Sequence, residues 1–582
     1  MTSPAAPPAT TAAAAFIEAL VEVGIEYLFA NLGTDHVSII EELARREEIG
    51  LASPRVILCP HENVAAHMAG GYALATGRGQ AVLVHVDAGT ANAAMAMHNL
   101  FRSRIPVLLI AGRAPYSFHG TLAGGRDNYV HFVQDPFDIA SLVRSYCKWE
   151  YDLPSGLLGR ASVHRAHSVM HSDPMGPVFL TFARETLAAE ISADQLAAEP
   201  TPRGGAVKAG GVDTALAEQI ADALMAADKP IAITGYLGRT PQAADVLNAL
   251  ARACAIQVCE FNPTDANIRR DSPCLFTGSP EEAMADADLG LLLDIDVPFL
   301  PKAAPFASRM RWLQIDVDPL KSDFPMWGFD SDLRIQASCA LALRQVLDLV
   351  RAKSDATFQA RIDARMKALE AAAATRRERL NSPAASRDAL AMSADDVCAA
   401  VASRLSSEDL VVNEAVTNAG TALNRLSQGR PGTYFANGGG GLGHSGGVAL
   451  GLKLAHPDRR VVQVVGDGVF HFINADSVYA VAHRYGLPIL TVVLDNAGWK
   501  AVKSAVQRVY PNGAAGRADS FQSRLVDAPS DGARHFAKLC QAFGGDGEEV
   551  FESDQLQGAL DRCLAALDRG QAAVLHVHIA PH

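Results

Sequence analysis

The sequence predicts three doubly wound α/β domains, each built on a parallel β-sheet. Short apolar runs alternate with longer stretches of helical pattern along all 582 residues, and several of these runs end at Gly or Asp. Both features are typical of buried parallel strands that lead into helices. The chain is also too long for one core, since roughly 150 residues per domain gives about three or four domains. The runs expected to be strands are Val82–Val86, Val107–Ala111, Ile231–Thr234, Leu289–Leu293, Leu313–Val317, Val461–Val465 and Ile489–Leu494.

Two segments near the ends of the chain resemble each other. The first reads QAVLVHVDAG, then a helical stretch, then RSRIPVLLIAG; the second reads RVVQVVGDG, then a helical stretch, then HRYGLPILTVVLDNAG. Asp87 precedes Pro106 by 19 positions, and Asp467 precedes Pro488 by 21. Two related α/β domains would produce such a repeat. The alternative is that all strand–helix–strand units look alike.

Changes in composition indicate the domain boundaries. Glu185–Gly211 is rich in Ala, Pro and Gly, and Ala352–Arg387 is highly charged, rich in Ala and helical in pattern. We therefore expect an N-terminal domain at 1–190, a central α/β domain at 191–370 and a C-terminal domain at 371–582.

The composition predicts a cytoplasmic globular protein. A formal charge of −13 argues against nucleic acid as a partner, and no apolar run approaches the ~20 residues that cross a membrane. Met1–Ala15 lacks the basic and long apolar regions of a signal peptide. The nine cysteines form no CxxC pairs, which predicts buried free thiols in a reducing compartment rather than a zinc ribbon or an iron–sulfur cluster.

Polar residues follow two of the expected strands near the C-terminus. Gly466-Asp467-Gly468 ends one strand, and Asn496 lies 28 residues after Gly468, at the end of the next. In a parallel sheet these two ends lie at one edge, where ligands bind. A carboxylate, an amide oxygen and nearby backbone oxygens suit Mg²⁺, and the two glycines let the backbone approach a phosphate closely.

An acidic residue opens a small-residue helix near the N-terminus. Glu62 follows the apolar run Val56–Cys59 and leads into AAHMAGGYALATG. A lone Glu at a helix start is usually solvated and favoured by the helix dipole. A helix of small residues packs closely, however, so we expect the Glu62 carboxyl to be buried.

A glycine-rich loop precedes another small-residue helix. Gly438–Gly447 reads GGGGLGHSGG, and its free N–H groups before a helix could bind an anion. A flexible surface loop is the alternative for this segment alone.

Taken together, these segments resemble the thiamine-diphosphate enzymes, in the order in which that family has them. The resemblance includes acetolactate synthases, 2-oxo-acid decarboxylases and 2-hydroxyacyl lyases, and it extends over nearly the whole chain. It implies a pyrimidine-binding N-terminal domain, a central domain and a diphosphate-binding C-terminal domain. Thiamine diphosphate would contact Gly466, Asp467, Gly468 and Asn496, with Mg²⁺ held by Asp467, Asn496 and the carbonyl of Gly498. Two departures are Asp495 in place of a first Asn, and an interval about two residues longer than in acetolactate synthases.

The resemblance also implies roles for the other two segments. Glu62 matches the catalytic glutamate, which activates the aminopyrimidine of the cofactor. Leu442, between Gly441 and Gly443, matches the apolar residue that keeps the cofactor bent. In the family's geometry Glu62 and Asp467 of one site come from two subunits, so a homodimer is the smallest active unit and a homotetramer is common.

The expected activity is cleavage or formation of a C–C bond next to the carbonyl of a 2-oxo acid or 1,2-dicarbonyl compound, by a decarboxylase, carboligase or synthase. His36, His119 and Gln134 are candidate substrate residues, and Trp499 with the following helical stretch could form a lid. The alternatives are a 2-hydroxyacyl-CoA lyase, a diketone hydrolase and, more distantly, a non-catalytic cofactor-binding protein. FAD or ADP in the central domain is left open, because its strands carry no nucleotide motif. GGGGLGHSGG lacks the long preceding strand of a dinucleotide site, which excludes an NAD-dependent dehydrogenase.

Overall fold

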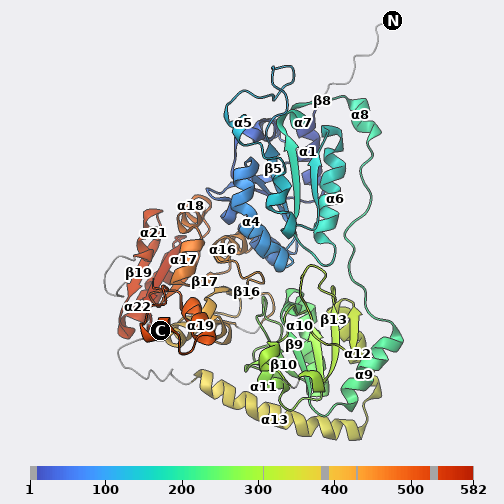
Figure 1. Ribbon diagram of the computed structural model, residues 1–582, viewed down its shortest axis with the longest axis vertical. Coiled ribbons are helices and arrows are strands. Elements are labelled where there is room, and N and C mark those ends of the chain that lie inside the picture. The colour runs from blue at the N-terminus through green and yellow to red at the C-terminus, as the bar shows by residue number, and fades with distance from the viewer. Residues whose placement is uncertain (1–9, 306, 382–391, 428–429, 525–534, 581–582) are drawn as a thin grey trace.

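The computed structural model describes residues 10–305, 307–381, 392–427, 430–524 and 535–580, and it contains three six-stranded parallel sheets (Figure 1). The N-terminal sheet comprises β2 (Tyr27–Ala30), β3 (Arg55–Leu58), β4 (Gln80–Val84), β5 (Val107–Arg113), β6 (Glu150–Leu153) and β7 (Val178–Ala183). The central sheet comprises β9 (Pro230–Thr234), β10 (Gln257–Glu260), β11 (Leu275–Phe276), β12 (Leu289–Leu293), β13 (Arg311–Asp316) and β14 (Leu333–Gln336). The C-terminal sheet comprises β15 (Leu410–Glu414), β16 (Tyr434–Ala436), β17 (Val461–Gly466), β18 (Leu490–Asp495), β19 (Asp546–Val550) and β20 (Ala573–His578). The predicted fold class is confirmed.

The N-terminal and C-terminal sheets have the same topology. Their strand orders are β3-β2-β4-β5-β7-β6 and β16-β15-β17-β18-β20-β19, so each strand has its counterpart at the same place. The central sheet has the different order β11-β10-β9-β12-β13-β14. The sequence repeat therefore corresponds to two domains of one topology.

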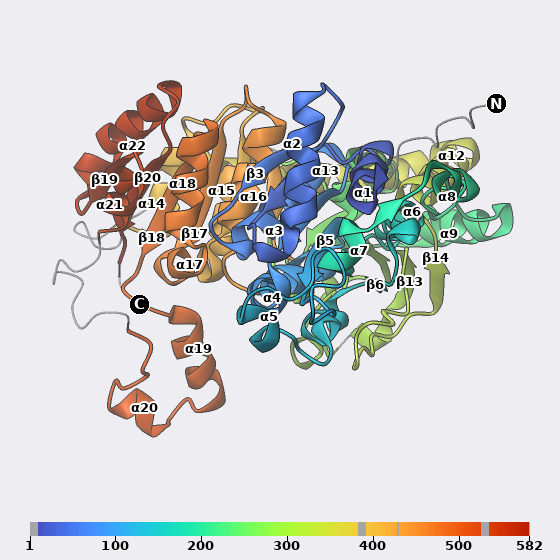
Figure 2. The same ribbon diagram turned by 90° about the horizontal axis from the view of Figure 1, so that it is seen from above.

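Helices cover both faces of each sheet (Figures 1 and 2). Around the N-terminal sheet they are α1 (Ala12–Glu22), α2 (Val37–Glu48), α3 (Glu62–Thr76), α4 (Val86–Arg102), α5 (Val130–Val133), α6 (Gly159–His171) and α7 (Arg184–Ala188). The central part has α8 (Ala193–Ala198), α9 (Thr214–Ala226), α10 (Pro241–Cys254), α11 (Pro280–Met284), α12 (Cys339–Lys353) and α13 (Ala356–Asn381). The C-terminal part has α14 (Ala394–Ala402), α15 (Ala419–Leu426), α16 (Ser445–Ala455), α17 (Asp467–Phe472), α18 (Ala475–Tyr485), α19 (Lys500–Val509), α20 (Ala514–Arg517), α21 (Phe536–Ala542) and α22 (Ser553–Asp568).

One hydrophobic core joins the N-terminal and C-terminal domains. It contains Val82 and Leu109 of the first sheet, Val465 of the third, and Met68 and Leu450 of α3 and α16. These two helices pack so closely that a Cβ atom added at Gly451 would lie 2.1 Å from the Met68 carbonyl oxygen. The small residues of both helices thus bring the Glu62 helix against the helix that follows the glycine-rich loop.

Several local predictions can be compared with the structure. The run Val82–Val86 is two residues too long at its carboxyl end, because β4 ends at Val84 and α4 begins at Val86. The charged connector is helical, as expected, in α13, and the predicted boundary at 370 lies inside that helix; residues 382–391 of the connector lie outside the described residues. Among the helices that the structure describes, none is long and apolar enough to cross a membrane.

Candidate active site

A cavity of about 260 Å³ opens at the carboxyl edge of the C-terminal sheet, where β17 and β18 end side by side. Gly466 pairs with Leu494, so the residues that follow each strand are neighbours, as the sequence predicted. The cavity is lined by Ala415, Val416, Thr417, Asn418, Leu442, Gly466, Asp467, Gly468, Val469, Phe472, Asn496, Gly498, Trp499, Lys500, Ala501 and Val502. Leu442 of the glycine-rich loop and the Gly466–Gly468 segment therefore face one space.

The oxygen atoms around this cavity suit a hard cation. The Asp467 side chain is buried, and its Oδ1 accepts a hydrogen bond from the Gly468 N–H at 2.9 Å. Asn496 Oδ1 accepts from the Gly498 N–H at 3.2 Å. A Cβ atom at Gly468 would lie 2.6 Å from the Trp499 ring, so a larger residue here would displace that ring. A carboxylate, an amide oxygen and a backbone carbonyl are donors of the kind that Mg²⁺ takes beside phosphate oxygens.

A buried carboxylate holds the glycine-rich loop in place. Glu414, the last residue of β15, accepts hydrogen bonds from the N–H groups of Gly443 (2.7 Å), His444 (3.3 Å) and Ser445 (3.0 Å). Burial alone would raise the pKa of Glu414, but its contacts with His444 and Ser445 lower it, so the carboxylate stays ionised. Gly443 has φ +98, and a Cβ atom there would lie 2.1 Å from the Phe472 carbonyl oxygen. The position of Leu442 is thus fixed from the strand beside it.

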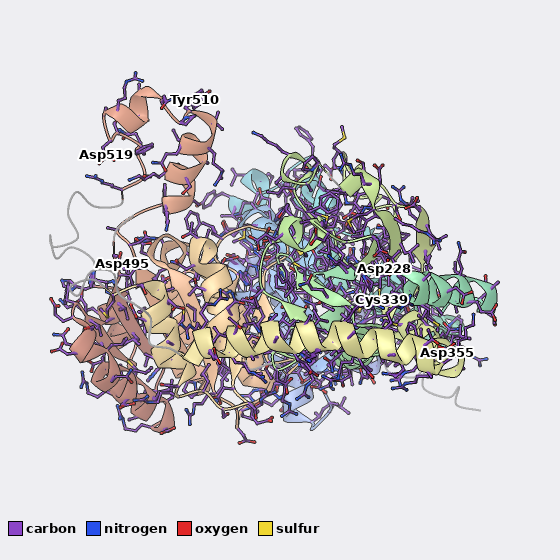
Figure 3. All side chains as sticks on the ribbon, turned by 90° about the horizontal axis from the view of Figure 1, so that it is seen from below. Asp228, Cys339, Asp355, Asp495, Tyr510 and Asp519 are labelled. Carbon is purple, nitrogen blue, oxygen red and sulfur yellow. The ribbon has the colours of Figure 1, made fainter. Side chains whose placement is uncertain are left out.

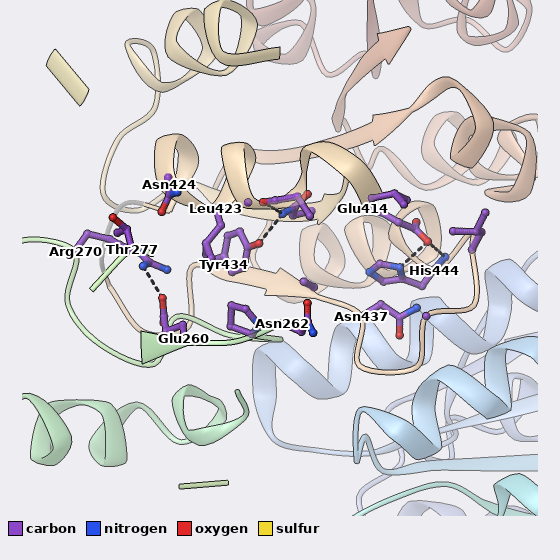
Figure 4. A pocket seen from close by; sticks show the side chains of 18 of the residues that line it. Glu260, Asn262, Arg270, Thr277, Glu414, Leu423, Asn424, Tyr434, Asn437 and His444 are labelled. Carbon is purple, nitrogen blue, oxygen red and sulfur yellow. Dashed lines mark hydrogen bonds and ion pairs between the residues drawn. The ribbon is translucent and has the colours of Figure 1, made fainter. Parts of the chain in front are cut away.

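A second cavity of about 340 Å³ adjoins the first, since Val416 and Leu442 line both. It lies between the central and C-terminal domains, with Arg270 and Glu260 at one end and Glu414 and His444 at the other (Figure 4). Arg270 Nη1 lies 2.5 Å from Glu260 Oε2, and His444 Nδ1 lies 2.9 Å from Glu414 Oε1. Each end therefore carries a pair of polar side chains in contact, and the middle is open.

Glu62 occupies the first turn of α3 at the carboxyl edge of the N-terminal sheet. It is 6% exposed, which confirms the expected burial. Asn92 Nδ2 donates a hydrogen bond to Glu62 Oε2 at 3.0 Å, and the N-cap residue His61 accepts one from the Asn63 N–H at 3.1 Å. Asn63 Nδ2 lies 3.4 Å from the Gly443 carbonyl oxygen. The start of α3 thus reaches the glycine-rich loop of the same chain, although Glu62 does not line the Asp467 cavity.

Models of two protein domains match the chain at these sites. They are "Thiamine pyrophosphate enzyme, N-terminal TPP binding domain" at residues 10–142 and "Thiamine pyrophosphate enzyme, C-terminal TPP binding domain" at residues 415–577. The chain belongs to the thiamine pyrophosphate enzyme family.

Relatives of this thiamine pyrophosphate enzyme align along nearly its whole length. Benzoylformate decarboxylase of Pseudomonas aeruginosa is 24% identical over 577 residues, covering 96% of this chain and 97% of that protein. The acetolactate synthase large subunit IlvG of Mycobacterium tuberculosis is 25% identical over 569 residues, covering 96% and 94%. The crystal structure of benzoylformate decarboxylase from Polynucleobacter necessarius has a TM-score of 0.77 at 19% identity and covers 98% of each chain. The structural likeness supports the fold.

The carboxyl edge of the N-terminal sheet of this thiamine pyrophosphate enzyme also carries a polar cluster, which the sequence predicted only in part. His85 Nδ1 lies 2.6 Å from Asp35 Oδ1, and its Nε2 lies 3.0 Å from Gln134 Oε1. The hydrogen bond with Asp35 raises the pKa of His85. Burial would raise the pKa of Asp35, but hydrogen bonds with His36 and His85 lower it strongly. The His85 side chain is a quarter exposed and Gln134 is half-buried, so a substrate could reach both.

The three predicted substrate residues lie in different settings. Gln134 belongs to the His85 cluster. His36 is fully buried, with the Gly33 N–H 3.0 Å from its Nδ1 and the Val84 carbonyl 3.1 Å from its Nε2, so it holds the loop beside Asp35. His119 lies exposed on the loop after β5. The structure brings together Gln134 and His36 through Asp35 and His85, and leaves His119 apart from them.

Proposed function

We propose that this enzyme uses thiamine diphosphate and Mg²⁺ to cleave or form a C–C bond next to the carbonyl of a 2-oxo acid or 1,2-dicarbonyl compound. The observation that carries the proposal is the single cavity in which Asp467, Asn496 and Gly498 face Leu442. Relatives along the whole chain include a benzoylformate decarboxylase and an acetolactate synthase subunit, and both names describe chemistry at a 2-oxo acid. A decarboxylase or a synthase fits this site.

Each residue of the candidate site would have a separate role in cofactor binding or proton transfer. Asp467, Asn496 and the Gly498 carbonyl would hold Mg²⁺ and through it the diphosphate, while Gly466 and Gly468 leave room for its oxygens. Leu442, flanked by Gly441 and Gly443, would support the cofactor rings. When bound, the cofactor supplies a thiazolium carbanion that adds to a carbonyl carbon. Glu62 would hold a proton for the aminopyrimidine, which gives proton transfer worth typically ~10²–10⁴-fold in rate.

Substrate contacts are assigned to the His85 cluster. His85, whose pKa the Asp35 carboxylate raises, can transfer protons at the edge where Glu62 lies. Gln134 can hydrogen-bond a substrate there, and His36 fixes Asp35. His119 is retained as a candidate on the neighbouring loop. Trp499 and α19, which border the Asp467 cavity, would act as its lid. We propose a homodimer as the smallest active unit and a homotetramer as the assembly.

The metal assignment is tested by calorimetric titration with thiamine diphosphate, with and without Mg²⁺. For the parent protein we expect Mg²⁺ to raise the affinity strongly, and for Asp467→Asn we expect this gain to disappear. Asp476→Asn, at an exposed aspartate of α18, should behave like the parent. An equal gain in Asp467→Asn would refute the assignment.

The reaction is tested by product analysis with 2-oxo acids such as benzoylformate and pyruvate, with 1,2-diketones and with 2-hydroxyacyl thioesters. Turnover of a 2-oxo acid or a diketone to a shortened or condensed product supports the proposal. If only the thioesters are turned over, the 2-hydroxyacyl-CoA lyase replaces the proposed function. If diketones are simply hydrolysed, the diketone hydrolase replaces it. A visible absorption spectrum of the purified protein decides whether the central domain carries a flavin.

A further inference from the structure

A second polar cluster lies at the carboxyl edge of the C-terminal sheet, toward β20 and β19 and away from the Asp467 cavity. It consists of Asp495 at the end of β18, Glu549 on β19, His576 and His578 on β20, and His535 before α21. Figure 3 labels Asp495 in this domain. Asp495 directly precedes Asn496, and its Oδ1 accepts a hydrogen bond from the Ala497 N–H at 2.9 Å, but no residue of the cluster lines the Asp467 cavity. The proposed reaction does not use the cluster.

The strand register explains why these side chains meet. Asp495 pairs with His578, and Glu549 pairs with His576. Paired residues of parallel strands face the same side of a sheet, and so do residues two apart along one strand. Three neighbouring strands therefore present two carboxylates and two imidazoles on a single face, where α21 covers them.

The distances within the cluster suit a transition metal. Asp495 Oδ2 lies 2.8 Å from His576 Nε2 and 3.6 Å from His578 Nδ1. One ligand atom from each of the three residues can be chosen so that all lie within 4.8 Å of one another. Four ligands at bond lengths of 2.0–2.1 Å in a tetrahedral site lie about 3.3 Å apart. The observed separations bracket that value, so small side-chain rotations would admit an ion.

A further carboxylate lies behind the imidazoles. Glu549 Oε1 is 3.0 Å from His578 Nε2 and 3.6 Å from His576 Nδ1, and Glu549 Oε2 is 3.0 Å from His535 Nδ1. Histidines that bind metals usually direct the second ring nitrogen to such a carboxylate, which fixes the ring. His576 is fully buried, and its Nδ1 has no hydrogen-bond partner among the described residues. That atom is available to Glu549 once a metal holds the ring.

Two aromatic rings pack against the imidazoles of the cluster. The Phe551 ring stacks on His578 at 4.3 Å between centroids and 9° between planes, and the Phe536 ring lies 4.8 Å from His576. These rings limit the rotation of both imidazoles. A fixed ring orientation is what the outer partners of a metal-binding histidine provide.

We propose that Asp495, His576 and His578 bind a transition-metal dication of the Zn²⁺ class, with Glu549 orienting both imidazoles. Imidazole ligands select such ions over Mg²⁺, which prefers oxygen alone. A metal here would tie β18 to β20 directly beside Asn496. The competing explanation is a metal-free network in which protonated imidazoles pair with the two carboxylates.

The test is a titration of the full-length protein with Co²⁺, after removal of metals by a chelator and in the absence of thiamine diphosphate. We expect one equivalent of Co²⁺ to give the intense visible bands of a four-coordinate site, and Zn²⁺ to displace it. Asp467→Asn, which lacks the carboxylate proposed for Mg²⁺, and His456→Gln, at a histidine outside the cluster, should keep these bands. His578→Gln should lose them.

A second variant distinguishes loss of a metal ligand from misfolding of His578→Gln. Glu549→Gln removes only the orienting carboxylate, so it should keep the bands but weaken Co²⁺ binding by about 10- to 100-fold. Failure of the folded parent protein to bind Co²⁺ would establish the metal-free network and overturn the proposal. Loss of the bands in Asp467→Asn, with their retention in His578→Gln, would overturn it as well.

Discussion

Single carboxylates determine the local geometry on both sides of the candidate site. Glu414 gathers three backbone N–H groups at the start of α16 and so fixes the loop that carries Leu442. Its neighbour Ser445 Oγ accepts a hydrogen bond from Gln463, which in turn accepts one from Thr491. A buried, fully connected chain of this kind is rigid because breaking any link leaves a polar group without a partner. In the N-terminal domain, Asp35 similarly fixes the turn after β4, because it contacts His85 and accepts a hydrogen bond from the Val86 N–H.

Asp35→Asn is expected to lower the pKa of His85, because the hydrogen bond with the Asp35 carboxylate raises that pKa. The pair stabilises the folded state fully below the ordinary histidine pKa of about 6.5. That contribution is lost as pH rises through the raised folded-state pKa. In the variant, His85 should therefore lose its proton at a lower pH than in the parent protein. An NMR titration of the imidazole measures the two pKa values.

Asp87→Asn is the control, since Asp87 is the weakest of the groups that raise the pKa of His85. It should move the titration far less than Asp35→Asn does. An unchanged His85 pKa in Asp35→Asn would show that the ion pair is not formed in solution.

His85 also shows where prediction from the sequence stops at this scale. Asp467, Asn496 and Glu62 could be found because each follows an apolar run, and the end of a parallel strand is where ligands bind. The apolar pattern places His85 inside the predicted strand Val82–Val86. The chain leaves the strand at Val84, and Val86 takes φ +34, which is rare for a β-branched residue. No local pattern indicates that turn, because the surrounding structure imposes it.

At the scale of elements, the pairing of α3 with α16 connects Glu62 to the glycine-rich loop. The small-residue pattern of both helices was visible in the sequence, and so were the buried strands, since strands covered on both faces are continuously apolar. Which helices would pack together could not be predicted. That depends on contacts between segments almost four hundred residues apart, such as Asn63 with Gly443.

Gly451→Ala should destabilise the protein by about 1–3 kcal/mol, the usual cost of overpacking. The new methyl group would meet the Met68 carbonyl oxygen at 2.1 Å and the Tyr72 nitrogen at 2.7 Å, and neither backbone atom can move freely. Thermal unfolding followed by circular dichroism gives the change. Gly420→Ala in α15 meets no atom within 4 Å, so it should be neutral or stabilise by about 0.4–1 kcal/mol. Similar unfolding temperatures for both variants would contradict the close packing.

At the scale of the whole molecule, a buried ion cluster joins the N-terminal and central domains. Arg104, in the turn after α4, contacts Asp296 at 2.9 Å and Asp316 at 3.1 Å, and Lys321 contacts the same two carboxylates at 2.8 and 2.7 Å. The cluster lies at the carboxyl ends of β12 and β13. Two cations shared by two carboxylates fix the central domain against the edge of the N-terminal one.

Arg104→Met should destabilise the protein by about 3–5 kcal/mol, because removing Arg104 leaves two buried carboxylates with Lys321 as their one cation among the four residues of the cluster. Arg102→Met provides the matched comparison two residues earlier. Its ion pair with Asp323 is 2.7 Å long but solvent-exposed, and such pairs contribute about 0–1 kcal/mol. Unfolding in denaturant measures both. Equal losses in the two variants would show that the buried cluster does not hold the domains together.

The assembly decides how Glu62 meets the cofactor, since Glu62 lies outside the cavity lined by Asp467. If two chains share each site, co-expression of differently tagged Glu62→Gln and Asp467→Asn chains should restore activity that neither variant has alone. Random pairing makes half of the dimers mixed, and one of the two sites in a mixed dimer has both intact residues, so about a quarter of the parental activity is expected. Two differently tagged Glu62→Gln chains serve as the control and should stay inactive. Mixed dimers isolated through both tags should reach about half of the parental activity, and inactivity of these dimers would mean that each chain builds its own site.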